Sequence, residues 1–376
     1  MAGTLGRLSA IEWWRNMKYE YWFANIKGIS GKRKQIIRTG MKSLEKLYYI
    51  EETALETLGI LEQEKTALLD SIRNWDLGGE YRKLEERGIA FLTILDESYP
   101  RRLKEIASPP YALYVKGEAP QEHIPTVAIV GARECSAYGE QMATVFGKAL
   151  AKAGVQVISG MARGVDAAGQ WGALEAGGKS YGILGSGVDV CYPGEQRKLY
   201  ETLQKQGGLI SEYPPGTRPM PQHFPARNRI ISGLSDAVLV IEAKEKSGSL
   251  ITADMALEQG KDVYALPGPV TSRLSKGCNE LIRQGAGILL SPEMFLEELG
   301  INGTLTKENE EQKKLLLESE ENIVYSCLGL YPKNTDRLLA ETKLSVVELL
   351  DVLMRLELKG YVKEITKNHY TRTKQI

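Results

Sequence analysis

The middle of the chain contains seven short apolar runs, and the stretches between them are long enough to form helices. This alternation is typical of a parallel, doubly wound α/β sheet, in which each helix returns the chain to the start of the next strand. The fold class that it predicts is therefore α/β. The runs occupy residues 127–130, 155–158, 181–184, 209–211, 238–241, 263–266 and 288–290.

Glycines follow several of these runs directly. In open α/β sheets, ligands bind at the carboxyl ends of the strands, where such turns gather. We therefore expect the functional site at that edge of the sheet. The glycines are Gly131, Gly160, Gly185, Gly187 and Gly268.

The flanking segments have other patterns, and 376 residues exceed the size of one ordinary domain. Leucines at helical spacing predict a helical domain over residues 1–78, of the SAM or helix-hairpin-helix type. The doubly wound core, preceded by a mixed connector, takes up residues 79–300. The polar and charged residues 301–321 predict a linker. Three helical patterns followed by a two-stranded wing predict a winged-helix domain over residues 322–376.

A short turn within the helical domain has two interpretations. Residues 26–33 lie between two helical patterns and contain Gly28 and Gly31. They fit a helix-hairpin-helix turn that holds a phosphate on its backbone amides. They also fit a tight turn with solvated lysines, which is the favoured interpretation.

The overall charge excludes a uniformly basic nucleic-acid coat protein. The chain has 48 basic and 48 acidic residues, so any affinity for nucleic acid must come from local patches. Its four cysteines form no CxxC pair and it has only three histidines, which argues against a structural metal site or a disulfide framework. No apolar run reaches the length of a membrane span. We expect a soluble, reduced, cytoplasmic protein that requires no cofactor.

Two cationic turns bracket the apolar run at residues 237–243. In the first turn, Arg227 and Arg229 would flank a phosphate chain if Asn228 began a helix. Phe224 then offers a stacking face for an unpaired base, or is a buried anchor for the loop. We expect Arg227→Ala and Arg229→Ala each to weaken DNA binding with little loss of fold.

The second turn contains Lys244 and Lys246, followed by Ser247, Gly248 and Ser249. These residues form either an anion-binding nest or a well-capped helix start.

Arg133 follows the first apolar run of the sheet and also has two interpretations. It is either a phosphate clamp or a surface side chain paired with Glu134.

Other glycine-rich segments predict no catalytic site. The run at residues 182–187 resembles a nucleotide loop, but we interpret it as scaffold. The chain lacks GxxxxGK[ST], HExxH and GxSxG motifs, and its acidic residues assemble no general acid and base. We therefore expect no enzymatic activity.

The ordered motifs of residues 81–299 closely resemble those of the bacterial DNA-processing protein A family, also called DprA or Smf. The helical and winged-helix segments resemble the outer parts of the same family. One departure is the segment ending in Gly169 and Gln170, where the family commonly has a histidine. The resemblance rests on Tyr99-Pro100, Pro109-Pro110, residues 130–133, 159–166, 185–189, 211–216, 224–234, 247–253, 256–260 and 277–282.

The resemblance implies an extended Rossmann-like core that binds single-stranded DNA and forms a homodimer. It also implies that the protein protects incoming DNA and loads the RecA recombinase during natural transformation, without catalysing a reaction. The site residues that it implies are Arg133, Phe224, Arg227, Asn228, Arg229, Lys244, Lys246, Ser247, Gly248 and Ser249.

Two other functions compete with this interpretation. Related Rossmann-like folds bind or process nucleotides, so the chain could be a nucleotide sensor or a nucleotide-processing enzyme. The winged helix could instead read DNA as part of a transcription factor. Its expected recognition helix has only Arg355 and Lys359 as cations, which suits protein contacts better.

Overall fold

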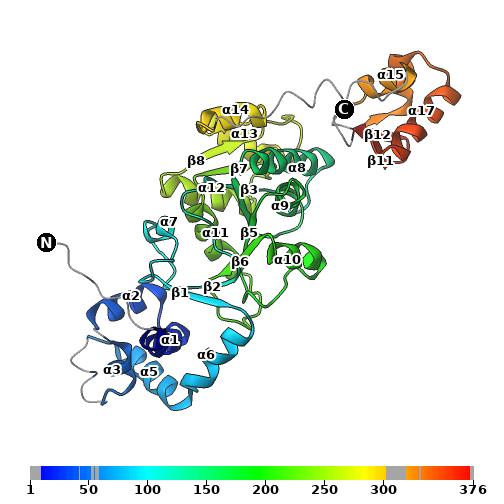
Figure 1. Ribbon diagram of the computed structural model, residues 1–376. Helices are drawn as coiled ribbons and strands as arrows, with labels where there is room; N and C mark the ends of the chain where they lie inside the picture. The colour runs from blue at the N-terminus through cyan, green and yellow to red at the C-terminus, as the bar shows by residue number, and fades with distance from the viewer. Residues whose placement is uncertain are drawn as a thin grey trace.

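The computed structural model describes residues 10–41, 43–51, 55, 59–301, 319–329 and 332–372 (Figure 1). All seven apolar runs form strands, and neighbouring members of this set pair in parallel, which confirms the doubly wound core. These strands are β3 (Thr126–Val130), β4 (Gln156–Ser159), β5 (Ser180–Ile183), β6 (Gly207–Ser211), β7 (Ala237–Val240), β8 (Asp262–Ala265) and β9 (Gly287–Ile288).

The order of the strands creates a switch point in the sheet. From β3 the chain winds outward through β4, β5 and β6, and it then crosses back to place β7 on the other side of β3. Val130 at the end of β3 pairs with Val240 at the end of β7. The loops after these two strands therefore diverge and leave room for a ligand between them.

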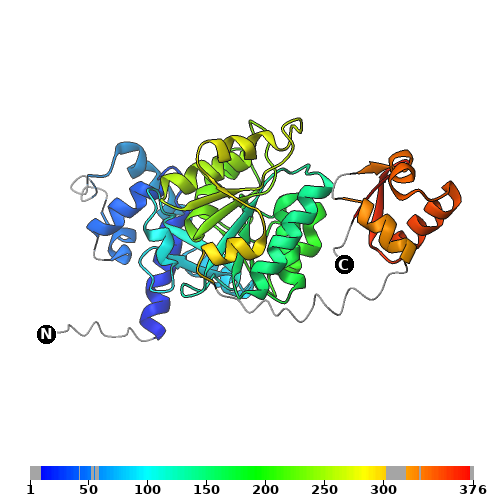
Figure 2. The ribbon, with the colours of Figure 1, turned by 90° about the horizontal axis from the view of Figure 1, so that it is seen from above.

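Helices cover both faces of the sheet (Figure 2). The apolar side chains of β3 alternate between the faces: Val127 and Ile129 pack on one side, and Ala128 and Val130 on the other. The first side is covered by α8 (Ala137–Lys152), α9 (Val165–Glu175) and α14 (Pro292–Glu298). The second is covered by α7 (Arg101–Lys104), α11 (His223–Leu234), α12 (Gly248–Glu258) and α13 (Lys276–Arg283). A further helix, α10 (Arg197–Leu203), packs beside β5 and β6.

The expected connector contains two strands that the sequence pattern did not predict. β1 (Ala90–Thr93) and β2 (Ala112–Gly117) pair with each other in antiparallel fashion, and β2 pairs antiparallel with β6. They extend the parallel sheet to nine strands in the order β1-β2-β6-β5-β4-β3-β7-β8-β9.

The N-terminal helices pack against this added edge (Figure 1). The rings of Tyr21 and Tyr114 lie 6.2 Å apart, and the amide of Asn25 donates a hydrogen bond of 2.9 Å to the Tyr114 hydroxyl. The helical run extends beyond residue 78, because its last helix ends at Glu86. The helices are α1 (Ala10–Asn25), α2 (Gly31–Gly40), α3 (Leu44–Tyr48), α5 (Glu62–Asn74) and α6 (Leu77–Glu86).

The turn between α1 and α2 has the features of a tight interhelical turn. Ser30 caps α2 by accepting a hydrogen bond from the backbone N–H of Arg33, and Gly28 adopts a φ of +87°. Lys27 is solvent-exposed, whereas Lys34 is buried and donates a 2.5 Å hydrogen bond to the carbonyl of Ala24. The structure thus favours the second interpretation of this segment.

Replacing Lys34 with methionine should change how stability depends on pH. Burial lowers the pKa of Lys34 from 10.5 to about 8. Between these two values the unfolded chain binds more protons, so this lysine makes the free energy of unfolding rise with pH. Lys34→Met should remove that rise and, at pH 7, increase stability by roughly 1 kcal/mol, since desolvation of the charge outweighs the lost hydrogen bond.

Urea unfolding of the wild-type protein and Lys34→Met at pH 7.5, 9 and 10 measures this effect. Other titrating groups contribute equally to both proteins, so the difference between the two curves isolates the lysine. If the free energy of unfolding changed with pH in the same way for both proteins, burial would not destabilise the charged form of Lys34.

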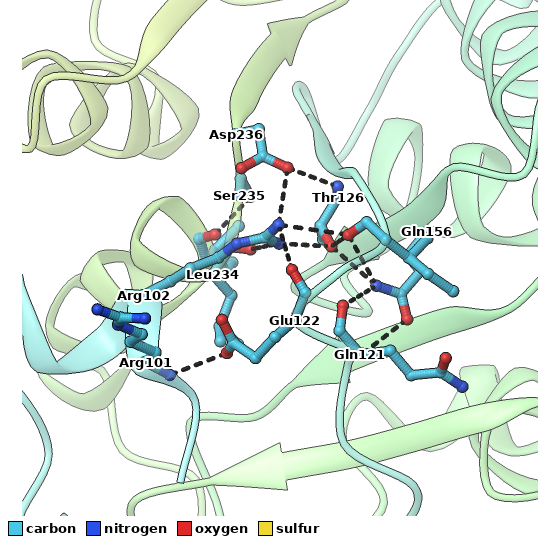
Figure 3. Close-up of polar contacts among 11 residues, drawn as sticks. Arg101, Arg102, Gln121, Glu122, Thr126, Gln156, Leu234, Ser235 and Asp236 are labelled. Atoms are coloured by element: carbon cyan, nitrogen blue, oxygen red, sulfur yellow. Dashed lines mark hydrogen bonds and ion pairs between the residues drawn. The ribbon is translucent and has the colours of Figure 1, made fainter. Parts of the chain in front are cut away.

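Arg102 of α7 joins the amino ends of β3 and β7, at the edge opposite the switch-point loops (Figure 3). Its guanidinium donates to Thr126 Oγ1 at 2.9 Å and to the carbonyls of Leu234 and Ile124, and forms an ion pair of 3.2 Å with Asp236. Arg102→Ala should lower the free energy of unfolding by about 3 kcal/mol, because the Asp236 carboxylate and several backbone carbonyls would lose their positively charged hydrogen-bond donor. Urea unfolding measures the loss.

Arg101→Ala is the matched control for this prediction. The Arg101 side chain is exposed, and the bond of this residue to Glu122 is donated by its backbone N–H. Equal stability of the two variants would contradict the role assigned to Arg102.

The C-terminal segment forms the expected winged helix. Its helices are α15 (Ser319–Cys327), α16 (Thr335–Thr342) and α17 (Val346–Leu358), and its wing strands are β11 (Val362–Thr366) and β12 (His369–Arg372). A two-residue strand that was not predicted, β10 (Lys333–Asn334), pairs with β12. Most of the expected linker, residues 302–318, lies outside the described residues, and residues 319–321 belong to α15.

The outer face of α17 is apolar. Val347, Met354 and Leu358 are 78%, 64% and 83% exposed. Lys359, one of the two cations considered for DNA reading, binds the carboxylate of Glu321 at 2.7 Å. This surface is poorly suited to reading base edges.

Every helix among the described residues is too short or too polar to cross a membrane. The four cysteines are free thiols. No three His, Cys, Asp or Glu side chains in the described ranges are grouped as a metal ion would require.

Candidate nucleic-acid interface

A cleft of about 630 Å³ opens at the switch point between β3 and β7. The loops that follow these strands line it, together with the first turns of α11 and α12. Nine of the ten predicted site residues lie in its wall, and Arg229 does not. The nine are Arg133, Phe224, Arg227, Asn228, Lys244, Lys246, Ser247, Gly248 and Ser249.

Three of these residues supply exposed positive charge. Arg133, Lys244 and Lys246 are exposed, and within the described part of the chain none of them forms an ion pair. Arg133 therefore does not pair with its neighbour Glu134. The carboxylate of Glu245 binds Lys276 at 3.3 Å, so it does not neutralise the lysines on either side of it. These cations are available to an anionic ligand.

A buried carboxylate fixes the loop that presents Arg133. Glu242, which is 4% exposed and lies two residues after β7, accepts hydrogen bonds from the backbone N–H of Ser136 at 2.8 Å and from the Ser136 hydroxyl at 2.6 Å. At the start of the loop, a Cβ on Gly131 would lie 2.7 Å from Val165. Only glycine allows the β3 loop to pass this close to α9.

The N-terminus of α12 forms another part of the wall. Ser247 is its N-cap, and the hydroxyls of Ser247 and Ser249 lie 2.8 Å apart. The positive end of the helix dipole and the nearby Lys244 and Lys246 both favour an anion here. The cap and the anion nest considered for this turn are thus compatible.

Helix α11 begins earlier than the sequence pattern suggested. Its first residue is His223, so Asn228 lies inside the helix instead of starting it. The Asn228 amide donates a 3.3 Å hydrogen bond to the carbonyl of Gly248 and ties α11 to the start of α12. The proposed flanking of a phosphate by Arg227 and Arg229 at a helix start is therefore wrong.

Arg227 lies at the bottom of the cleft and is 5% exposed. Its guanidinium donates to the carbonyl of Gly160 at 2.9 Å and to that of Ile183, so it joins α11 to the ends of β4 and β5. Burial lowers the pKa of Arg227 to about 10, and the charge of Asp166 acts in the opposite direction. These contacts contradict the expectation that Arg227→Ala leaves the fold intact.

Arg229 points away from the cleft. It forms two hydrogen bonds with the carboxylate of Glu212, at 2.7 and 2.6 Å, and donates to the carbonyl of Ser108. Its position indicates a structural contribution, which also corrects the expectation for Arg229→Ala.

Phe224 is anchored in the wall of the cleft. It is half-buried, and a Cβ on Gly185 would lie 3.0 Å from its ring. The guanidinium carbons of Arg133 and Arg227 lie 5.8 and 6.0 Å from the ring centre. The ring therefore anchors the loop and also lines the cleft.

Asp166 and Tyr192 are among the wall residues that sequence reasoning did not select. Asp166 is buried and accepts a 3.1 Å hydrogen bond from the N–H of Gly160. Burial raises its pKa, and the nearby charge of Arg227 opposes that rise. The Tyr192 ring lies 5.5 Å from Phe224 and is 45% exposed. The only signal for either residue was its place in a turn after a strand.

The glycine run at residues 182–187 is scaffold and does not line the cleft. A Cβ on Gly182 would approach Leu209 at 3.0 Å, and one on Gly187 would lie 2.7 Å from the carbonyl of Pro214. Close packing within the protein thus accounts for these glycines.

Comparison with known proteins identifies the two parts of the chain. Residues 90–300 match the family described as DNA recombination-mediator protein A, and residues 308–365 match the DprA winged helix domain. The protein Smf of Synechocystis is 32% identical over 95% of this chain and 99% of its own length.

Two solved structures are also similar. The crystal structure of DNA processing protein A from Streptococcus pneumoniae has a TM-score of 0.65 and 32% identity, and covers 75% of this chain and 97% of its own. DNA processing protein A from Helicobacter pylori has a TM-score of 0.51 and 30% identity, covers 56% of this chain and 95% of its own, and was studied for its single-stranded DNA binding mode. These matches show that the chain belongs to the DNA recombination-mediator protein A family, known as DprA or Smf.

Proposed function

We propose that this protein binds single-stranded DNA in the switch-point cleft. The observation that carries the proposal is the group of three unpaired cations, Arg133, Lys244 and Lys246, around the N-terminus of α12. Phosphates would lie against these groups, since Lys, Arg and helix N-termini are the usual partners of a nucleic-acid backbone. The similarity to the Helicobacter pylori protein supports the choice of a single strand.

The aromatic side chains of the cleft give a physical reason for preferring unpaired DNA. Phe224 and Tyr192 lie among the cations, where a base could stack on an aromatic ring while its phosphate stays in contact with a lysine. In a duplex, the bases already stack on one another and their faces are not accessible. We expect the cleft to discriminate against double strands for this reason.

We infer a role as a mediator that protects incoming single strands and transfers them to a RecA recombinase in natural transformation. The description of the matched family as a recombination mediator supports this role. A non-catalytic, cytoplasmic homodimer is part of the same proposal. Asp166, the buried carboxylate of the cleft, accepts a hydrogen bond from the N–H of Gly160. This contact suits a residue that stabilises the loop better than one that transfers protons.

Fluorescence anisotropy with a labelled oligonucleotide tests the binding proposal. The full-length protein should bind the single strand more tightly than the duplex, and rising salt should weaken binding as counterions compete for the phosphates. The measurement is made at a low and a high salt concentration. The proposal is refuted if the protein does not bind the single strand, or if it binds the single strand and the duplex equally at both concentrations.

The alternative of a nucleotide sensor or nucleotide-processing enzyme has less support. Protein atoms pack closely around Gly182 and Gly187. A thermal-shift screen with mono-, di- and triphosphate nucleotides addresses it directly. A specific shift with a free nucleotide, without DNA binding, would favour the alternative.

A further inference from the structure

Tyr192 is the most exposed aromatic side chain in the wall of the cleft. It is 45% exposed, and no hydrogen bond of its hydroxyl occurs within the described residues. Its ring rests on Phe224 with 5.5 Å between the ring centres and 36° between the planes. Part of the Tyr192 ring is therefore accessible to a ligand in the cleft.

The loop that leads to Tyr192 is held in place by hydrogen bonds between Ser186 and Val190. The N–H of Val190 donates to the carbonyl of Gly187 at 2.9 Å, and the Ser186 hydroxyl donates to the carbonyl of Val190. Beneath the loop, the Tyr200 hydroxyl donates to the carbonyl of Val188 at 2.6 Å. A ring on such a loop is pre-organised, so a planar ligand that stacks on it would cost little side-chain entropy.

Phe224 supports this ring and is less accessible itself. Its edge touches Gly185, and the Arg133 and Arg227 guanidiniums approach it to about 6 Å. Tyr192 covers part of what remains. The outermost aromatic face of the pair is thus that of Tyr192.

We propose that Tyr192 is the stacking platform for an unpaired nucleobase, with Phe224 as its support. The proposal rests on the proposed binding of single-stranded DNA and assigns separate tasks to two groups of residues. Arg133, Lys244 and Lys246 hold phosphates and determine the salt dependence. Tyr192 contacts a base and should contribute affinity that does not depend on salt.

Tyr192→Leu and Tyr192→Phe form the test pair. Leucine keeps an apolar contact with Phe224 but removes the ring, whereas phenylalanine keeps the ring. On an ordinary single strand, Tyr192→Leu should weaken binding about 5- to 50-fold with an unchanged salt slope, and Tyr192→Phe should bind within about twofold of wild type.

A strand with abasic sites completes the design as a double-mutant cycle. Without bases there is nothing to stack, so Tyr192→Leu and wild type should bind that strand equally. An equal loss on both strands, or no loss on the ordinary strand, would overturn the role of Tyr192. If wild type does not bind the ordinary strand at all, the proposed function itself fails, so the two failures are distinct.

A second readout does not depend on affinity. An oligonucleotide containing 2-aminopurine should lose fluorescence when it is saturated with wild-type protein, because stacking on a tyrosine quenches this base. At saturation, Tyr192→Leu should not show this quenching. Equal quenching by wild type and Tyr192→Leu would exclude Tyr192 as the platform, and an unchanged melting temperature confirms that the variant is folded.

Discussion

Replacing Lys244 and Lys246 together by alanine is expected to weaken binding of single-stranded DNA on the order of 10- to 50-fold at moderate salt. Both side chains are exposed, line the cleft and form no ion pair within the described residues, so their charge is fully available to phosphates. Each lost phosphate contact removes about 0.7 from the slope of log affinity against log salt. The double variant should therefore lower the magnitude of the slope by about 1.4, which anisotropy at four or more salt concentrations would measure.

The control is Lys152→Ala combined with Lys261→Ala. These lysines lie at or just beyond the C-terminal ends of α8 and α12, whose N-terminal ends face the cleft. They likewise form no ion pair in the part of the chain that the structure describes. The control removes the same charge from the opposite edge of the sheet. If both double variants showed the same loss of affinity and the same decrease in salt slope, the overall charge of the protein would explain the binding. The cleft would then not be the binding site.

Replacing Arg227 by alanine is expected to lower the free energy of unfolding by about 3 to 4 kcal/mol. The guanidinium is buried and donates hydrogen bonds to the carbonyls of Gly160 and Ile183. In the alanine variant these buried carbonyls would have no hydrogen-bond donor. Asp166 would lose the positive charge that opposes the burial-induced rise of its pKa. Urea unfolding followed by circular dichroism measures the loss.

Arg133→Ala is the comparison for this second prediction. Arg133 belongs to the same cleft but is exposed, so its loss should weaken DNA binding and leave the stability unchanged. A fully stable Arg227→Ala protein would contradict the structural role of the buried arginine. A change of DNA affinity in an unstable Arg227→Ala protein would be an indirect effect of a disturbed cleft.

The central sheet could be predicted because its signal is local. Each of its seven parallel strands is a short apolar run between helical lengths, and each run is present in the structure. β1 and β2 lacked such a signal, since β2 depends on antiparallel pairing with β6, more than 90 residues further along the chain, and β1 depends in turn on pairing with β2. The two-residue β10 depends in the same way on β12.

The candidate site could be predicted to the level of loops but not of side-chain directions. Strand ends and cationic turns led to nine residues of the cleft wall. Spacing alone could not show that Arg229 of α11 binds Glu212, which follows β6. The exposure of Tyr192 likewise depends on how its loop packs, which the sequence pattern does not reveal.

The shared core of the N-terminal helices and the sheet has a consequence for cooperativity. Trp22, Tyr114 and Leu209 belong to one apolar cluster, whereas the described winged-helix core draws only on residues 324–370. Heating should therefore melt the chain up to residue 301 as one calorimetric unit and the winged helix as another. A ligand bound in the cleft should raise the melting temperature of the first unit alone.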